Sequence, residues 1–372
     1  GSVRKSNLNR PFICPILRRP MLETIPCSGH VNWWILVYRY FTHQFLNKKV
    51  CILKTIIMCA FRIALTGSLL LASQFTLAES CIPSKWGPDD EIGSANYVSP
   101  EQVLMAVKLV KKGQVHPLGI VVDPGMPAFP PRSMSLVIVQ PGQHNGRQLH
   151  QEFGWDVVYN DDQASLWFGI GPQLDGLGHM GEAGEYYNCN AAVDFIDIAG
   201  LKKLGTEKVP PLVGRGVLLD MAKHFGVEVM SAGQSISSTE IKAVAKAQGV
   251  QIRQGDVVLF HTGWTDGMLV SHPQAWAAGE PGLSNEAAAY VASLEPMAVG
   301  ADTWGVDVVP PIEGDKIFYG HVEFLKKKGI YILETMNTGR LASESVHEFM
   351  FVLGQARIKG TVQMIINPVA MW

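Results

Sequence analysis

The sequence has little charge of either sign. Only 17% of its 372 residues are charged, and the balance of acidic and basic side chains leaves a formal net charge of -2. A chain without basic excess does not suggest nucleic-acid binding, which depends on Lys and Arg neutralising phosphates. The hydrophobic share of 47%, with 37 Gly and 22 Pro, favours a globular α/β or α+β chain of enzyme-like composition with a large core. A globular domain of unknown role fits the same numbers.

Cysteine is also scarce in the part of the chain that follows the N-terminal 78 residues. Of six cysteines, only Cys81 and Cys189 lie beyond residue 78; the others are Cys14, Cys27, Cys51 and Cys59. No Cys-x-x-Cys pair occurs, so a thiolate metal site is not expected. In an oxidising compartment two thiols can pair, but neither spacing nor motif decides whether Cys81 and Cys189 do.

The apolar run that follows Met58 is too short to cross a bilayer comfortably. From Met58 the sequence reads "MCAFRIALTGSLLLASQFTLAES", with one Arg at position 62, an apolar stretch at 63–72 and the small-residue end Thr76-Leu77-Ala78. This pattern predicts a signal peptide over 58–78. The mature chain would then be 79–372, periplasmic or secreted, with no stable membrane anchor after processing.

Residues 1–57 precede this natural-looking start. Gly1-Ser2 resembles a cloning remnant, and "VNWWILVYRYFTHQF" follows neither a helical nor a strand period. We interpret 1–57 as translated upstream sequence, an alternative start or an artificial leader, and exclude it from the fold. A membrane-associated helix over 31–57 in a longer precursor is the alternative.

The mature chain alternates helix and strand signals. Capped amphipathic helices are expected from Ser99-Pro100, over 237–249 and over 284–296. Apolar runs predict strands near 115–122, 133–140, 214–221, 255–264, 297–307 and 330–335, with a short helix from His321 and two closing strands at 347–358 and 361–372. Because no linker or repeat interrupts the pattern, we predict one α/β domain whose mixed β-sheet is flanked by helices.

The segment "GPQLDGLGHMG", 171–181, carries an Asp and a His among four glycines. Glycine this dense disfavours a helix, so we expect a tight irregular loop. Asp175 and His179 are the side-chain types that metal sites and acid-base catalysis use. A turn-forming Asp and a core His are the alternatives.

Other chemistry-bearing residues follow predicted strands. His261, Asp302 and Glu334 lie at strand ends, and His321 opens a helix. Carboxyl ends of strands in open α/β sheets converge on a crevice. Asp302 and its neighbour Asp307 are expected to bond loop backbone. His, Asp and Glu without Cys suit a metal bound through nitrogen and oxygen, such as Zn²⁺ or Mn²⁺.

Five blocks carry a family resemblance. "QLDGLGH", "GRGVLLD", "LFHTGW", "VGADTWGVD" and "H…GIYILET" occur in this order between about Trp86 and the C-terminus. Together they resemble the cyclase family of metal-dependent hydrolases, which includes kynurenine formamidase and isatin hydrolase. The resemblance implies a swivelling β/β/α cyclase-like fold, a small-molecule substrate and a homodimer.

The family signature, His-x-Gly-Thr-His-x-Asp-x-Pro-x-His, matches only in part. Its Gly, Asp and last His fall on Gly171, Asp175 and His179, whereas the departures are Gly169 for the first His, Pro172 for Thr, Gln173 for the second His and Leu177 for Pro. The segment is similar to a branch of the family with Thr-Gln-x-Asp-x-Leu-x-His, except at Pro172.

The resemblance implies a divalent-metal site. Its ligands would be Asp175, His321 and Glu334, with the carbonyl oxygen of Gln173 as an addition, and His179 would be the general acid or base. An amide oxygen is a weaker and harder donor than imidazole, so the site should favour Mn²⁺ or another hard cation, or bind Zn²⁺ weakly. For His321 and Glu334, the alternatives are a surface residue and a buried partner of an Arg.

The reaction implied is hydrolysis of an amide, lactam, ester or lactone by metal-activated water. Trp167, Tyr187 and Trp264 flank the motif blocks and would form an aromatic wall for the substrate, although core packing is their alternative role. Because two ligand His are missing, an exported small-molecule-binding protein with a degenerate metal site is the alternative function. The survival of His179 and of the His321/Glu334 pair favours an enzyme.

Overall fold

A computed structural model describes residues 81–140, 153–155 and 157–372. The chain divides into two units, Gly1–Glu79 and Ser80–Trp372, and all described residues belong to the second. The predicted upstream segment 1–57 and signal peptide 58–78 lie outside the described residues. Within the described ranges, no helix combines the length and the apolar character that crossing a membrane requires.

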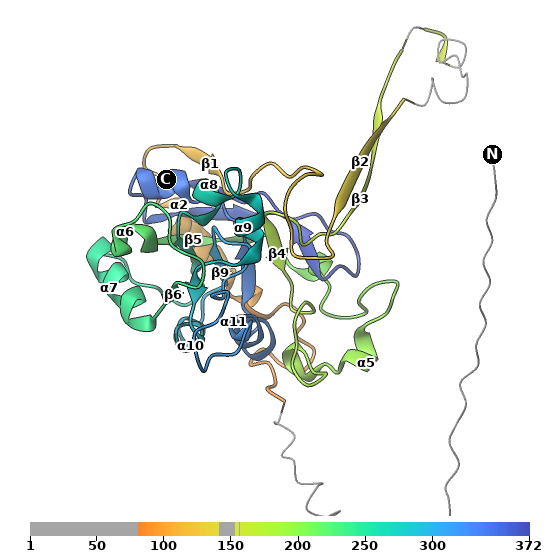
Figure 1. The fold of residues 1–372 in the computed structure, drawn as a ribbon. Coiled ribbons are helices and arrows are strands. Elements are labelled where there is room, and N and C mark those ends of the chain that lie inside the picture. The colour runs from red at the N-terminus through yellow and green to blue at the C-terminus, as the bar shows by residue number, and fades with distance from the viewer. Residues whose placement is uncertain (1–80, 141–152, 156) are drawn as a thin grey trace, which may run out of the picture. The chain divides into compact units, whose positions relative to one another are not determined.

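A mixed sheet forms the centre of the second unit (Figure 1). Nine described strands follow the order β1-β13-β11-β5-β7-β9-β10-β4-β12. Strands β5, β7, β9 and β10 run parallel, and the remaining pairings are antiparallel. Their bounds are β1 Val115–Pro117, β4 Gln173–Asp175, β5 Leu212–Asp220, β7 Val257–His261, β9 Ala298–Ala301, β10 Tyr331–Glu334, β11 Glu348–Leu353, β12 Gln363–Ile365 and β13 Val369–Met371.

The parallel strands carry the core because they are covered on both faces. Every residue of β7, β9 and β10 is buried, as expected for strands that read as continuous apolar runs. Their polar residues stand at their carboxyl ends, where His261 and Glu334 close β7 and β10. The core therefore holds the strand ends in place.

Serine caps start the longer helices where the sequence predicts them. The side chains of Ser99, Ser237 and Ser284 accept backbone N–H groups at the starts of α2 (Pro100–Val107), α7 (Ser238–Gln248) and α10 (Asn285–Ser293). In α7, Glu240 completes a capping box. Helix α2 packs on β5 and β11, α7 packs on β5, and α10 packs on α7. The predicted α/β fold, a mixed sheet flanked by helices, is confirmed.

The other elements are short. A hairpin of β2 (Met134–Val139) and β3 (Asp161–Leu166) forms a sheet of its own and extends away from the main sheet (Figure 1). Strands β6 (Ser235–Ile236) and β8 (Gly282–Leu283) pair in parallel. The remaining segments are η1 Gly93–Tyr97, η2 Tyr187–Cys189, α5 Ala192–Phe195, η3 Thr206–Lys208, α6 Met221–Phe225, α8 Trp264–Met268, α9 Pro273–Ala278, α11 Tyr319–His321, the π-helical η4 Val322–Lys328 and α12 Gly339–Ser343.

Three local predictions need correction. The glycine-rich segment is not wholly irregular, because Gln173–Asp175 forms β4 and finds a ladder partner on each side, β10 and β12. The helix expected from His321 is α11 followed by the π-helical η4. The last predicted strand is divided into β12 and β13, with Pro368, which has no N–H to donate to a ladder, between them.

A disulfide joins Cys81 to Cys189, with their Cα atoms 5.1 Å apart. It ties the first described residues to η2, ten residues beyond His179. Asn188 adds to this attachment, because its side chain bonds the backbone of Ser84, Gly87 and Asp90. The pairing that the sequence left open is thus present in the structure.

Candidate metal centre

Three neighbouring strands place four polar side chains on one face of the sheet. Strand β4 opposes Gln173 to Glu334 of β10 and Asp175 to Gln363 of β12. Directly opposed residues point to the same face, as do residues two apart on one strand. These four side chains therefore meet above β4, and all four are buried.

Asp175 is held through one carboxylate oxygen and leaves the other without a partner. Its Oδ1 accepts hydrogen bonds from Gln173 Nε2 at 3.2 Å and Gln363 Nε2 at 2.7 Å. Its Oδ2 is fully buried and has no hydrogen-bond partner among the described residues. That oxygen lies 3.7 Å from Nε2 of His321 and 3.9 Å from Nε2 of His179. An unpaired buried carboxylate oxygen facing two imidazoles is a place for a cation.

His321 is oriented by a second carboxylate. Its Nδ1 lies 2.6 Å from Oδ2 of Asp307, whose Oδ1 accepts the N–H of Gly320. Asp307 thus bonds loop backbone, as predicted, and also fixes the ring so that Nε2 faces Asp175. A ring nitrogen held by a carboxylate while the other turns to a site is the usual arrangement of a metal-binding His.

His179 stands where the chain turns after β4. Its backbone N–H donates to the carbonyl oxygen of Gly176 at 2.9 Å, and its side chain faces Asp175. Burial lowers the pKa of His179, and this outweighs the opposing effect of the Asp175 charge. The ring is therefore neutral near pH 7 and can accept a proton.

The centre is crowded with carboxylates. Burial raises the pKa of Glu334 to about 8, and the charge of Asp175 adds to this effect. Burial also raises the pKa of Glu280 well above its usual value, with Glu334 as a second cause. For His321, burial would lower the pKa, but its bonds to Asp307 and Glu334 raise it well above the usual value. A bound cation would relieve this excess of negative charge.

The donor set fits a divalent metal. Asp175, His179 and His321 each offer one ligand atom, and these atoms lie within 4.8 Å of one another. Oε1 of Glu334 is 3.1 Å from Nε2 of His321, so this carboxylate borders the same space. Oxygen and nitrogen donors without sulfur suit Mn²⁺ or Zn²⁺.

Gln173 lies in the centre, but its amide nitrogen, and not its carbonyl oxygen, points toward the carboxylates. Its Nε2 donates to Oδ1 of Asp175 and to Oε2 of Glu334. In this orientation Gln173 positions two acidic side chains, and its carbonyl oxygen points elsewhere. A role for that oxygen as a ligand stays a prediction.

Two other side chains occupy the space that the first His of the signature would need at position 169. A Cβ built on Gly169 would lie 2.7 Å from Nη1 of Arg132 and 2.7 Å from Oε1 of Gln363. Arg132 donates from Nη1 to the carbonyl oxygen of Gly169 at 2.7 Å. Sequence reasoning missed both residues, because they come from segments about 37 residues before Gly169 and nearly 200 residues after it.

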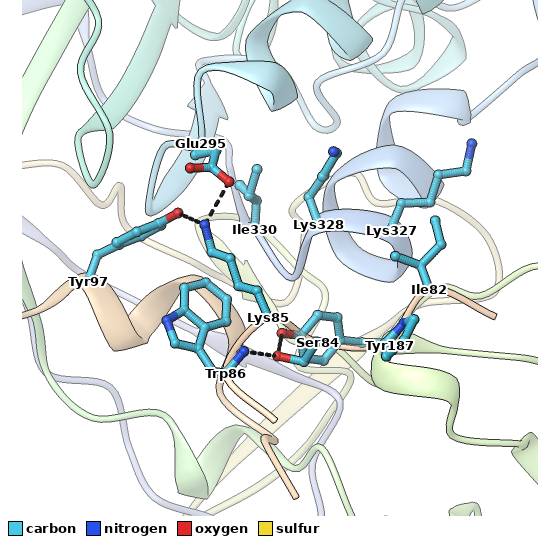
Figure 2. Close-up of a pocket in the computed structure, with 11 residues that line it drawn as sticks. Ile82, Ser84, Lys85, Trp86, Tyr97, Tyr187, Glu295, Lys327, Lys328 and Ile330 are labelled. Carbon is cyan, nitrogen blue, oxygen red and sulfur yellow. Dashed lines mark hydrogen bonds and ion pairs between the residues drawn. The ribbon is translucent and has the colours of Figure 1, made fainter. Parts of the chain in front are cut away.

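The three aromatic residues proposed as a substrate wall lie apart from this centre or inside the core. Trp167 is half exposed just beyond β3, and Trp264 is buried with its Nε1 3.4 Å from the carbonyl oxygen of Trp276. Tyr187 is buried and its hydroxyl donates to Asp90 and Ser84. Figure 2 shows Tyr187 in another pocket, beside Ser84. None of the three is in ring contact with His179 or His321.

A different aromatic cluster borders the centre. The ring of Phe318 lies 5.4 Å from that of His321, and the ring of Trp304 lies 6.4 Å from Phe318. Phe129 completes the cluster, 5.7 Å from Trp304 and 6.2 Å from Phe318, and it is 45% exposed. Trp304 was available in the block "VGADTWGVD", but Phe129 and Phe318 have no motif around them.

His261 and Asp302 form a cluster of their own. Nδ1 of His261 lies 2.8 Å from Oγ1 of Thr338 and 3.4 Å from Oδ2 of Asp302. Asp302 also accepts from the backbone and hydroxyl of Thr262, as expected of a loop-bonding carboxylate. The strand ends thus divide between two clusters instead of converging on one.

The sequence itself decides the family. The model of the family described as "Putative cyclase" matches residues 116–308, more than half of the chain. The chain belongs to the cyclase family. A search of curated proteins found no match.

Solved structures share the cyclase fold. A crystal structure of a novel cyclase is 24% identical, with a TM-score of 0.70, and the match covers 78% of this chain and 98% of that one. An isatin hydrolase bound to the product analogue thioisatinate is 17% identical, with a TM-score of 0.51 over 73% of this chain and 98% of that one. Isatin hydrolase A from Labrenzia aggregata, bound to benzyl benzoate, is 18% identical, with a TM-score of 0.50 and the same coverage. At these identities the likeness establishes the fold.

Proposed function

We propose that this chain is a metal-dependent hydrolase that cleaves an amide, lactam, ester or lactone bond. The observation that carries the proposal is the buried, unpaired Oδ2 of Asp175, which faces Nε2 of both His179 and His321. Membership of the cyclase family and the hydrolases among its structural neighbours support the same reaction class.

The metal, Mn²⁺ or Zn²⁺, would be held by Asp175, His321 and Glu334. Gln173 would add an oxygen donor once its amide group is rotated by half a turn. A divalent cation in such a site supplies Lewis acidity, which lowers the pKa of a water and polarises a carbonyl. Asp307 keeps Nε2 of His321 directed at the centre, and Gln363 keeps the free oxygen of Asp175 directed there.

His179 would move the proton. Because burial keeps its ring neutral near pH 7, His179 can accept a proton from the attacking water. The same ring can then deliver that proton to the leaving nitrogen or oxygen. For this proton transfer, the ring of His179 must lie near the metal without binding it.

The aromatic cluster of Phe129, Trp304 and Phe318 would pack on the substrate. Its rings lie beside His321 and would exclude water from the reacting carbonyl. The ring-bearing compounds in the isatin hydrolase structures, thioisatinate and benzyl benzoate, fit this kind of wall. We therefore place a ring in the substrate and assign the aromatic wall to this cluster, in place of Trp167, Tyr187 and Trp264, which lie apart from the centre or inside the core.

The alternative function is an exported small-molecule-binding protein with a degenerate metal site. The observation in its favour is that Arg132 and Gln363 fill the space at Gly169 and that Gln173 donates to two carboxylates. Such a protein would bind its ligand without turnover.

We propose further that the mature chain is periplasmic or secreted after cleavage at Ala78. The Cys81–Cys189 disulfide supports this, since disulfides persist in oxidising compartments. Mature protein from export-competent cells should begin at Glu79 by N-terminal sequencing. A protein that keeps residues 31–72 would instead be anchored at a membrane.

We also propose a homodimer. Leu136, Val137 and Ile138 of β2 are about half exposed, and a two-stranded ribbon is marginally stable unless something packs on it. Sedimentation should give twice the chain mass, and Ile138→Asp should shift the protein to monomer. A wild type that sediments as a monomer at micromolar concentration would contradict this.

Hydrolysis is tested by turnover of a panel of aryl amides, lactams, esters and lactones with Mn²⁺ or Zn²⁺ added. We expect at least one class to be cleaved, with activity lost in Asp175→Asn and in His179→Gln. Asp89→Asn, an exposed carboxylate far along the chain from these motifs, serves as the matched control and should keep full activity. Binding of ring compounds without cleavage of any of them would favour the binding protein.

A further inference from the structure

Arg132 occupies the space beside Gly169 that a side chain there would need. The Cβ of any residue at 169 would lie 2.7 Å from Nη1 and 2.8 Å from Cζ of Arg132. Within the part of the chain that the structure describes, the guanidinium is anchored by one bond, from Nη1 to the carbonyl oxygen of Gly169. Glycine at 169 and arginine at 132 therefore form a matched pair, which puts a fixed positive charge beside the position where the family signature has its first His.

The guanidinium lies beside a residue of the metal centre. Nη1 of Arg132 and Oε1 of Gln363 both lie 2.7 Å from the Cβ position at Gly169, and Nε2 of Gln363 donates to Oδ1 of Asp175 at 2.7 Å. Among the described residues, no acceptor bonds Nε or Nη2 of Arg132. As far as the described residues are concerned, the rest of its planar donor fork is therefore available to a ligand.

The same turn carries Arg132 and the aromatic cluster. The backbone N–H of Arg132 donates to the carbonyl oxygen of Phe129 at 3.1 Å. Phe129 at one end of this turn packs on Trp304 and Phe318, while Arg132 at the other end reaches Gly169. One turn thus presents an aromatic face and a guanidinium to the same centre.

We propose that Arg132 binds a carboxylate of the substrate, so that the substrates of this hydrolase are ring-bearing amides, lactams or esters that carry an anionic group. This inference rests on the proposed function. A half-buried guanidinium with free donors matches the two oxygens of a carboxylate, and such charge-assisted forks are about twice as strong as neutral hydrogen bonds. The fixed position of Arg132 would orient the scissile carbonyl relative to His179.

A purely structural role is the competing explanation. Arg132 would then only fill the space at Gly169, and its loss would weaken all ligands equally and lower stability. A specificity role instead discriminates between ligands of one shape that differ in charge. The two roles are therefore separated by probes that share a ring.

The test is calorimetric titration of benzoate and of benzamide into the purified protein, with and without added Mn²⁺. The variants are Arg132→Gln, Arg132→Lys and, as the matched control, Arg357→Gln, because Arg357 also donates to a backbone carbonyl, that of Glu207, but is exposed. Thermal unfolding of each variant shows whether the fold is intact.

We expect wild type and Arg357→Gln to bind benzoate at least about tenfold more tightly than benzamide. This difference is what one charged hydrogen-bond pair contributes to affinity. Arg132→Gln should remove this preference while leaving benzamide binding unchanged, and Arg132→Lys should restore part of it. Equal binding of both probes by wild type, or a benzoate preference that survives in Arg132→Gln, would overturn the proposal. The titrations without Mn²⁺ separate the two kinds of failure: a benzoate preference that depends on Arg132 but not on Mn²⁺ supports this inference even if the metal site fails, whereas a preference that depends on Mn²⁺ but not on Arg132 overturns it.

Discussion

At the scale of single residues, the metal centre depends on side chains that hold other side chains. Gln363 and Gln173 fix Asp175, and Asp307 fixes His321. Asp307 touches no proposed substrate position, so it is a positioning residue. Its effect is expected on metal affinity and not on the fold.

Replacing Asp307 by Asn should weaken metal binding by about 10- to 100-fold, the usual cost of losing the carboxylate behind a metal-binding His. Asn would keep one acceptor for the N–H of Gly320 but would no longer fix the ring of His321. Competition with a fluorescent chelator measures the affinity, and unchanged circular dichroism shows an intact fold. Affinity equal to wild type would show that His321 is not a ligand.

The acidity of Glu334 predicts how pH acts on the metal-free protein. Its pKa in the folded state is about 8, above its value in an unfolded chain, so the folded state binds the proton more tightly. The stability from this group is present at low pH and is lost as pH rises through about 8. Thermal unfolding of metal-free protein should therefore show a Tm that falls as pH rises from about 5 to about 8 and levels off above that.

Metal binding should show the opposite trend. Because Glu334 must lose its proton to bind a cation, affinity for Mn²⁺ should rise with pH up to about 8. The gain in Tm on adding Mn²⁺ should grow over the same range. A gain that is independent of pH would exclude Glu334 from the metal site.

The resemblance to the family named Asp175, His179, His321 and Glu334 from sequence, and the structure brings them together. Arg132, Gln363 and Phe129 could not be found that way, because their roles arise from contacts between segments far apart along the chain. No local pattern marks a lone Arg in a proline-rich loop. Their place in the site can be recognised only from the folded chain, in which β4 lies between β10 and β12.

At the scale of elements, the local signals predict helices better than strands. Helices α2, α7 and α10 begin at serine caps that are readable in the sequence. The central strands are readable as apolar runs. Strand β4 is different, because its three residues among glycines become a strand only through ladders on both sides. The site rests on this one element, for which local propensity gives the wrong prediction.

A buried ion pair joins β5 to the start of β7. Nη1 of Arg215 lies 2.6 Å from Oδ2 of Asp256, and both side chains are buried. Burial raises the pKa of Asp256 to about 6, although the charge of Arg215 opposes this. Glu348 of β11 also bonds Arg215 but is partly exposed.

Removing Asp256 should leave the charge of Arg215 without its buried partner. We expect Asp256→Ala to lower the free energy of unfolding by about 3–5 kcal/mol, measured by urea denaturation. Glu348→Gln is the comparison and should lose about 1 kcal/mol or less, because it is partly solvated. Equal losses would show that burial does not decide the strength of this pair.

At the scale of the whole molecule, the alternation of helix and strand signals was sufficient for the fold class. The family, and the cyclase fold with it, came from the resemblance of five ordered blocks. The disulfide was not predictable, because Cys81 and Cys189 are 108 residues apart and carry no motif. Their pairing depends on η2 returning to the segment that precedes η1.

This disulfide should contribute measurably to stability. Cross-linking residues so far apart restricts the unfolded chain, and we expect Cys189→Ser to lower the free energy of unfolding by about 2–4 kcal/mol. Unfolding in urea with and without a reductant gives the same comparison in the wild type. A variant as stable as wild type would show that the contacts of Asn188 suffice to hold the segment.

The metal centre is tested most directly by the metal content of the purified protein, measured by elemental mass spectrometry. We expect about one equivalent of Mn or Zn per chain, kept in Asp89→Asn and lost in Asp175→Asn. A wild type that stays metal-free after dialysis against Mn²⁺ and Zn²⁺ would contradict it. The centre around Asp175 would then belong to a binding protein and not to a hydrolase.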